Sequence, residues 1–450
     1  MTSLFARGES MQADRSSVLF MFFAQWFTDS VLRIDPTDRR KNTSNHDVDL
    51  CQIYGLSEQE ARCLRSGSGG RLRSQIINGE EYPDYLGERN DAGDWRVKEI
   101  YSCLDAHGKV VRDKGLYPHG NTEWTKTSLA GSFPPGSLSP QQLNKRLDKL
   151  YATGLERGNS SVGYVSLSLI FLREHNRICQ ELSNIYSSWD DADERLFQTA
   201  RMINICLLLK LTVEDYINHI TGERLFRFDP GFAEQQSWYR TNWIALEFDL
   251  LYRWHGLVPD ELIVDGAPVE AALYRWNNEL LEETGVGSII SNASSQAAGR
   301  VSLGNNPVFL MESEYQTIKM GRDFRLQSYN VYRERFGLKR LRSFSELTSN
   351  SVLARQLEAL YGDIDTLEFV IGLFAEDAQP GALFGSLLLT MVSYDAFTQI
   401  YTNPLLSKNI HTADSLTPYG LELIQTTESI EALVRRNLPA GSPILARLGV

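Results

Sequence analysis

Apolar residues recur along much of the chain at steps of three and four, which is the period of helices that bury one face. Four segments show this pattern most clearly: residues 16–34, 196–220, 238–255 and 351–361. Alternating apolar and polar positions, typical of half-buried strands, are few and short. The pattern therefore predicts a mainly α fold.

Helix-breaking residues gather at two places, a Ser/Gly tract at residues 66–70 and a Gly/Ser/Pro-rich stretch at residues 130–140. The apolar helical pattern resumes on both sides of each without a shift in composition. We find no internal repeat and no long low-complexity segment. These observations predict one domain over residues 1–450 with two surface excursions.

The net charge of −12 argues against a nucleic-acid-binding protein, because such proteins need a basic face to neutralise phosphates. One short basic cluster exists, at residues 339–342, and it reads most simply as a solvated helix or loop end. The apolar run at residues 18–23 is far shorter than the roughly 20 residues of a membrane span and follows a mixed segment. We therefore expect neither a transmembrane segment nor a secretory signal.

The five cysteines form a sparse, odd-numbered set without a CxxC pair. This favours reduced thiols over a disulfide framework, and with it a cytoplasmic location. The cysteines are Cys51, Cys63, Cys103, Cys179 and Cys206.

A tyrosine and a histidine stand close together in the run Leu251–His255, at the end of a predicted helix. Tyr252 and His255 are three apart, so a helix would place them on one face, with Cβ atoms about 5–6 Å apart. An imidazole can ligate haem iron, and a neighbouring phenol can be oxidised to a radical. Packing and helix capping are the alternative roles of such a pair.

Two polar residues interrupt the apolar segment at residues 16–34. Gln25 and Asp29 are four apart and share one helix face. Burying an amide and a carboxylate there is unfavourable unless both have partners. A ligand cavity would satisfy this requirement, and so would a structural hydrogen-bond pair.

Short runs in a fixed order connect these residues to a known family. The most specific are FFAQ at residues 22–25, REHNR at 173–177, LYRWH at 251–255, YNVYR at 329–333 and LEALYGDID at 357–365. Together, over most of the chain, they resemble the prostaglandin H synthase and fatty-acid dioxygenase branch of the animal haem peroxidase superfamily. The resemblance implies a helical domain that holds haem between helices.

The resemblance also implies roles for individual residues. His255, in the Trp254–His255 dipeptide of the cofactor site, occupies the position of the proximal ligand of the iron in haem b. Tyr252 occupies the place of the radical tyrosine, and Gln25 that of the distal glutamine. Tyr361 matches a tyrosine that holds the proximal histidine through a water.

The family pattern breaks at Asp29, where the family has its distal histidine. An aspartate with its reference pKa of about 3.9 accepts protons poorly at neutral pH, although burial raises that value. Asp29 is therefore either an acid–base group with different pH behaviour or the mark of a weakened peroxidase reaction, and we favour the second. Thr28 lacks the carboxylate that esterifies haem in mammalian relatives, so we expect no covalent haem link.

The expected substrate channel also departs from the family. Phe248, Leu251 and Phe384 match apolar residues of the family's substrate channel, although packing in the protein core explains them equally well. Ala396 falls near the position of the family's acetylatable serine. The tyrosine that holds a fatty-acid carboxylate is lost at residues 222–224. We also expect three family features to be missing: the arginine that holds the carboxylate together with that tyrosine, the growth-factor-like module and the membrane-docking helices.

The sequence thus favours a soluble haem dioxygenase that uses O₂ and peroxide and oxidises an apolar, fatty-acid-like substrate through Tyr252. Three alternatives stay open: a haem oxidase of specialised metabolism with a non-fatty substrate, a plain haem peroxidase, and a haem binder without turnover. His46 and His175 lie in matched motifs that do not bind iron, and we expect structural roles for both.

Overall fold

A computed structural model describes the chain except for residues 1, 36, 45–46, 241–243, 272 and 443. Helices dominate, which confirms the predicted mainly α class. The helices that build and surround the site are α1 (Val18–Thr28), α6 (Val162–Ile185), α7 (Ala192–Leu211), α9 (Leu246–Leu251), α11 (Val286–Ser295), α12 (Met311–Asp323) and α17 (Ser386–Tyr401). Further helices include α4 (Thr122–Gly131), α13 (Tyr329–Arg335), α15 (Ser351–Tyr361), α16 (Phe369–Ala375), α18 (Ala413–Thr426) and α19 (Ile430–Arg436).

Strands in the described part of the chain form four separate antiparallel pairs. The pairs are β1 (Gln12–Ser17) with β8 (Ala297–Gly299), β2 (Ser74–Ile77) with β3 (Glu80–Pro83), β4 (Gly87–Arg89) with β5 (Trp95–Val97), and β6 (Glu261–Val264) with β7 (Ala267–Glu270). The β1–β8 pair is the one that matters for the site, because β1 leads directly into α1.

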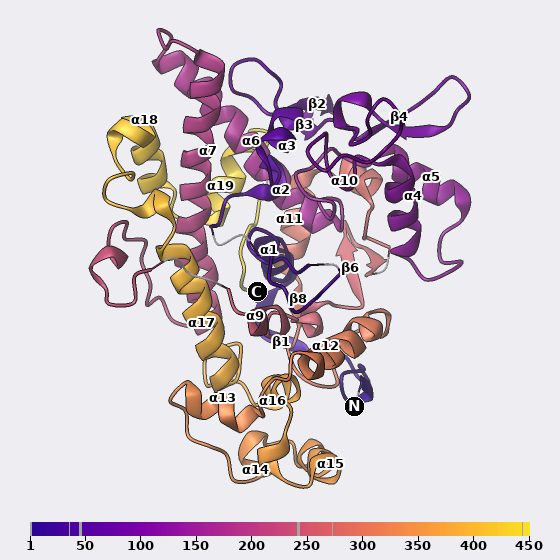
Figure 1. The fold of residues 1–450 in the computed structure, drawn as a ribbon, viewed down its shortest axis with the longest axis vertical. Coiled ribbons are helices and arrows are strands. Elements are labelled where there is room, and N and C mark those ends of the chain that lie inside the picture. The colour runs from indigo at the N-terminus through magenta and orange to yellow at the C-terminus, as the bar shows by residue number, and fades with distance from the viewer. Residues whose placement is uncertain (1, 36, 45–46, 241–243, 272, 443) are drawn as a thin grey trace.

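Helix α1 lies at the centre of the molecule (Figure 1). Its start is set by Ser17, whose side chain accepts a hydrogen bond from the backbone N–H of Phe20. Most of its residues are buried, and α6 and α11 pack against it. The two polar positions that break its apolar sequence, Gln25 and Asp29, fall at its C-terminal end.

The long helical segment that contains α7 continues through a π-helical stretch, η3 (Thr212–Ile217), into α8 (Asn218–Thr221). By length and composition the segment Ala192–Thr221 could cross a membrane, but 83% of its most apolar window is buried inside the protein. It is therefore a core element of this fold, packed between α6 and α18.

Two expected helices differ from those observed. The segment 16–34 is a strand end followed by α1, which stops at Thr28. In the segment 238–255 the helix is confined to Leu246–Leu251, while residues 241–243 lie outside the described residues. Tyr252 and Trp254 have non-helical backbone angles, and His255 begins a separate turn, η5 (His255–Leu257). The prediction that Tyr252 and His255 share one helix face is therefore wrong.

The predictions for α15, the cysteines and His175 agree with the structure. Helix α15 spans Ser351–Tyr361, as the apolar period predicted. The five cysteines are all buried and free. His175 is buried in a structural network, with Tyr54 on one ring nitrogen and the carbonyl of Gly70 on the other. His46 lies outside the described residues, and the single-domain assignment stays a prediction.

The contact between α1 and α6 gives a test of the fold. A Cβ at Gly163 would lie 2.1 Å from the ring of Phe22, which is fully buried. We expect Gly163→Ala to lower the free energy of unfolding by about 1–3 kcal/mol, because the ring must move in a packed core. Urea unfolding followed by circular dichroism measures this value. Gly131→Ala, in α4 with open space around it, is the control; equal stability of the two variants would contradict the packing described.

Candidate active site

A cavity of about 370 Å³ separates α1 from the segment that follows α9. Gln25, Thr28 and Asp29 line it from α1. Tyr252, Trp254 and His255 line it from the other side. Residues that the sequence assigned to opposite sides of a haem are therefore brought to one cavity, although more than 200 positions separate them in the chain.

The ring of His255 is held from behind by a buried carboxylate. Its Nδ1–H donates to Oε1 of Glu314, in the first turn of α12, and Asn306 donates to the same oxygen at 2.7 Å. Among the described residues, Nε2 has no hydrogen-bond partner. Because Nδ1 carries the proton, the lone pair of the ring is on Nε2, the nitrogen that a metal can use.

Tyr361 is not the residue that holds His255. Its hydroxyl donates to Glu368 at 2.8 Å, and α15, which it ends, lies at the lower end of the molecule, away from α9 (Figure 1). The contact expected of Tyr361 is made instead by Glu314. A glutamate in a first helical turn is common, since it favours the helix dipole, so nothing in the sequence distinguished it.

Tyr252 is buried in a group of aromatic rings. Its ring stacks on Trp254 with centroids 4.1 Å apart, and Phe248 packs at 5.1 Å. Its hydroxyl lies 2.5 Å from the hydroxyl of Tyr216, in the π-helical stretch η3. Burial raises the pKa of Tyr252 well above its ordinary value, so the phenol keeps its proton over the physiological range. Tyr216 was not among the site residues predicted from the sequence.

Asp29 is buried and forms an ion pair with Arg157, whose side chain is 58% exposed. Burial raises the pKa of Asp29, and the guanidinium of Arg157 opposes that rise. Gln25 is exposed to the cavity one helical turn away. Arg157 could not be predicted, because it pairs with Asp29 across 128 positions of sequence.

The residues expected along a substrate channel are divided between core and cavity. Phe248, Leu251 and Ala396 are buried where α9 packs against α17. Phe384 packs on Trp254 at 4.5 Å and lines a second cavity of about 640 Å³. Leu257 lines both cavities, so they share a wall.

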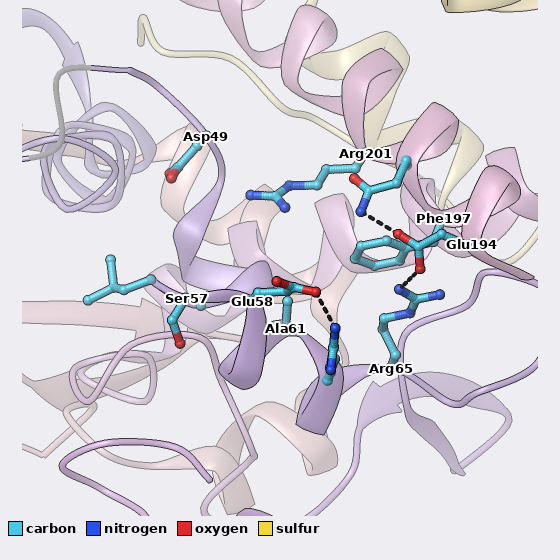
Figure 2. A pocket seen from close by; sticks show the side chains of 12 residues that line it. Asp49, Ser57, Glu58, Ala61, Arg65, Glu194, Phe197 and Arg201 are labelled. Atoms are coloured by element: carbon cyan, nitrogen blue, oxygen red, sulfur yellow. Dashed lines mark hydrogen bonds and ion pairs between the residues drawn. The ribbon is translucent and has the colours of Figure 1, made fainter. Parts of the chain in front are cut away.

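A third, smaller cleft of about 170 Å³ lies between α3 (Glu58–Leu64) and the beginning of α7 (Figure 2). Its charges largely face one another: Arg65 pairs with Glu194, and Arg201 extends towards the side of Asp49. Burial raises the pKa of Asp49 to about 6. None of the residues predicted for the site lines this cleft.

The sequence profile of the animal haem peroxidase family matches residues 98–445. The chain belongs to this family. Among animal haem peroxidases it is 33% identical to horse prostaglandin G/H synthase 2 over 436 residues, which are 96% of this chain and 64% of that protein. It is 34% identical to rat prostaglandin G/H synthase 1 over 396 residues, which are 87% of this chain and 58% of that protein. The chain thus spans less than two thirds of the length of these relatives.

Solved structures share the fold at lower identity. Peroxidase A from Dictyostelium discoideum superimposes with a TM-score of 0.72 at 17% identity, over 99% of this chain and 89% of that one. Fatty acid alpha-dioxygenase from Oryza sativa gives 0.73 at 16% identity, over 97% and 77%. These comparisons confirm the resemblance and the fold that the sequence predicted.

Membership of the animal haem peroxidases implies haem iron as the cofactor, and the cavity fits such a group. Its walls include the rings of Phe22, Tyr274 and Phe309, which suit a flat apolar ring. Arg253 and Arg275 also line it, and arginines can pair with the propionate carboxylates of haem. His255 supplies a nitrogen ligand with a free lone pair.

The Asp29–Arg157 pair predicts a specific pH dependence. If Asp29 accepts the proton of peroxide, that reaction must slow as pH falls through the raised pKa of the carboxyl group. Arg157→Gln removes the charge that lowers this pKa, so the acid limb of the peroxide rate should move to higher pH. Asp29→Asn should slow the reaction sharply, and Asp29→His should recover rate.

Stopped-flow measurement of the haem spectrum after mixing with peroxide, over a range of pH, checks these outcomes. Arg96→Gln, a surface arginine paired with Glu88, is the control. A limb that stays in place in Arg157→Gln, together with an unchanged rate in Asp29→Asn, would remove Asp29 from the reaction.

Proposed function

We propose that this protein is a haem-dependent dioxygenase that adds O₂ to an apolar, fatty-acid-like substrate by way of a radical on Tyr252. The observation that carries the proposal is that the phenol of Tyr252 and the imidazole of His255 line one cavity, with Trp254 stacked on the phenol. We also propose that the haem is haem b, held through Nε2 of His255 without a covalent link.

Bound haem would supply the oxidising equivalents. Loss of an electron and a proton by Tyr252 leaves a phenoxyl oxygen, and the hydroxyl of Tyr216, 2.5 Å away, is placed to hydrogen-bond that oxygen. A hydrogen atom then passes from a substrate carbon to this oxygen and restores the phenol, and O₂ adds to the carbon radical. The peroxyl radical that results takes the hydrogen atom back from Tyr252, which gives the hydroperoxide and regenerates the tyrosyl radical. The surrounding rings of Phe248 and Trp254 exclude water from the radical.

We propose that the second cavity holds the end of the substrate away from the reaction, while its reacting carbon reaches Tyr252, which lines the first cavity. The second cavity adjoins the aromatic stack at Phe384, and apolar side chains such as Leu353 and Phe374 line part of it. Arg15 also lines it and offers a charge for a carboxylate, whereas Arg300 pairs with Asp14. The names of the relatives, a fatty acid alpha-dioxygenase and prostaglandin synthases, support this substrate class.

A plain haem peroxidase is the second candidate. It is favoured by the distal side of the cavity, where Gln25, Asp29 and Arg157 offer polar groups that could bind peroxide. In such an enzyme Tyr252 would be structural. A cytoplasmic location is our proposal in both cases, supported by five cysteines without a disulfide.

Replacement of Tyr252 distinguishes the two candidates. Tyr252→Phe keeps the ring in its stack and removes only the oxidisable hydroxyl. We expect oxygenation of fatty acids to fall to background, while haem binding and peroxide oxidation of small dyes persist. Oxygen uptake, product analysis by mass spectrometry and freeze-quench electron paramagnetic resonance measure the three properties.

Tyr101→Phe is the matched control, because Tyr101 is a buried tyrosine that also loses one hydrogen bond, to Asp84. It should keep oxygenation and the tyrosyl signal. Full oxygenation by Tyr252→Phe would discard the radical mechanism and leave the peroxidase.

The form of the haem is tested by extraction. We expect acidic organic solvent to release intact haem b, since Thr28 offers no carboxylate for an ester. Chromatography and mass spectrometry of the extract identify the porphyrin. Haem that stays with the denatured protein would show that another side chain links it.

A further inference from the structure

The carboxylate of Glu314 lies in an unusual environment for a charged group. Its side chain is fully buried, and among the described residues it has no lysine or arginine partner. His255 and Asn306 both donate to Oε1, while Oε2 is buried and receives no hydrogen bond from the residues that the structure describes. A buried carboxylate is unfavourable unless an opposite charge or several hydrogen bonds compensate it. Here the compensation comes mainly from the imidazole.

The surrounding backbone holds this contact in place. Helix α12 carries Glu314, and its neighbour Ser313 lines the active-site cavity. On the histidine side, a Cβ at Gly256 would lie 2.5 Å from the carbonyl oxygen of Arg300, so the turn after His255 is packed tightly against the end of β8. The side chain of Asn305 also donates to the carbonyl of Gly256, at 3.2 Å.

We propose that Glu314 is a positioning residue that fixes the proton of His255 on Nδ1 and lowers the reduction potential of iron bound at Nε2. The inference rests on the proposed binding of haem by His255. A carboxylate that accepts the Nδ1–H makes the ring a stronger electron donor, as partners of metal-bound histidines do. Its negative charge, which no lysine or arginine among the described residues neutralises, also favours ferric over ferrous iron, because the ferric site carries one more positive charge.

The test is made on the haem-loaded full chain. Glu314→Gln keeps the shape and an oxygen that can accept the Nδ1–H, and it removes only the charge. We expect the ferric/ferrous midpoint potential to become more positive and the iron–histidine stretching frequency of the ferrous protein to fall. Spectroelectrochemistry and resonance Raman spectroscopy measure these two properties, neither of which depends on turnover.

Three further variants separate a charge effect from damage to the fold. Glu314→Asp keeps a carboxylate and should stay near the wild-type potential. Asn306→Ala removes the second donor to Oε1 of Glu314, and this change should strengthen the hydrogen bond from Nδ1 of His255. The midpoint potential of this variant should therefore move in the opposite direction, to more negative values. Glu312→Gln makes the same chemical change at an exposed site on α12 and should change neither property.

Glu314→Leu removes charge and acceptor together and should weaken haem retention by about 10- to 100-fold. A potential in Glu314→Gln equal to that of the wild type, with haem bound through His255, would overturn the role of Glu314 alone. His255→Ala should lose the histidine-ligated spectrum. If it kept that spectrum, the proposed haem ligation would fail, and the role of Glu314 would fail with it.

Discussion

The hydrogen bond between His255 and Glu314 is the contact around which the site is organised. A carboxylate without a cationic partner is unfavourable in a protein interior, and the imidazole N–H is its main compensation. The contact requires α12, the turn after α9 and the end of β8 to meet within a few ångströms. The close approach at Gly256 and the side chains of Asn305 and Asn306 satisfy that requirement.

The opposite wall of the cavity also contains a buried carboxylate, that of Asp29, which is compensated in a different way. Helix α1 is apolar and buried almost everywhere, and its packing against α6 leaves no room for a side chain at Gly163. Asp29, at its end, is compensated by Arg157, which lines the same cavity. The carboxylate of Glu314 is therefore compensated by an imidazole, while that of Asp29 is compensated by a permanent positive charge. Ligand retention and peroxide chemistry can be tuned separately in such a site.

The aromatic stack joins the two larger cavities of the molecule. Tyr252 and Trp254 line the first cavity, Phe384 lines the second, and the three rings are in contact in that order. Burial keeps the phenol of Tyr252 protonated, and Tyr216 provides its hydroxyl with a partner. The oxidisable phenol thus lies at the end of the stack that faces the first cavity, and Phe384 lies at the end that faces the second.

The sequence by itself determined the mainly α class, the burial of α1 and the bounds of α15. Through short motifs it also determined the family and the candidate residues Gln25, Tyr252, Trp254 and His255. These features depend on local periodicity or on runs of adjacent residues, which the chain displays directly.

The tertiary structure alone decided which partners those residues have. Glu314 in place of Tyr361, Arg157 beside Asp29, and Tyr216 beside Tyr252 are contacts between segments distant in the chain. The end of α9 at Leu251 could not be predicted from the sequence either, because the apolar helical period continues through Tyr252. The backbone turns there because His255 packs on Glu314 and β8. Burial and pairing of charges follow from the packing of separate elements, and no local pattern records them.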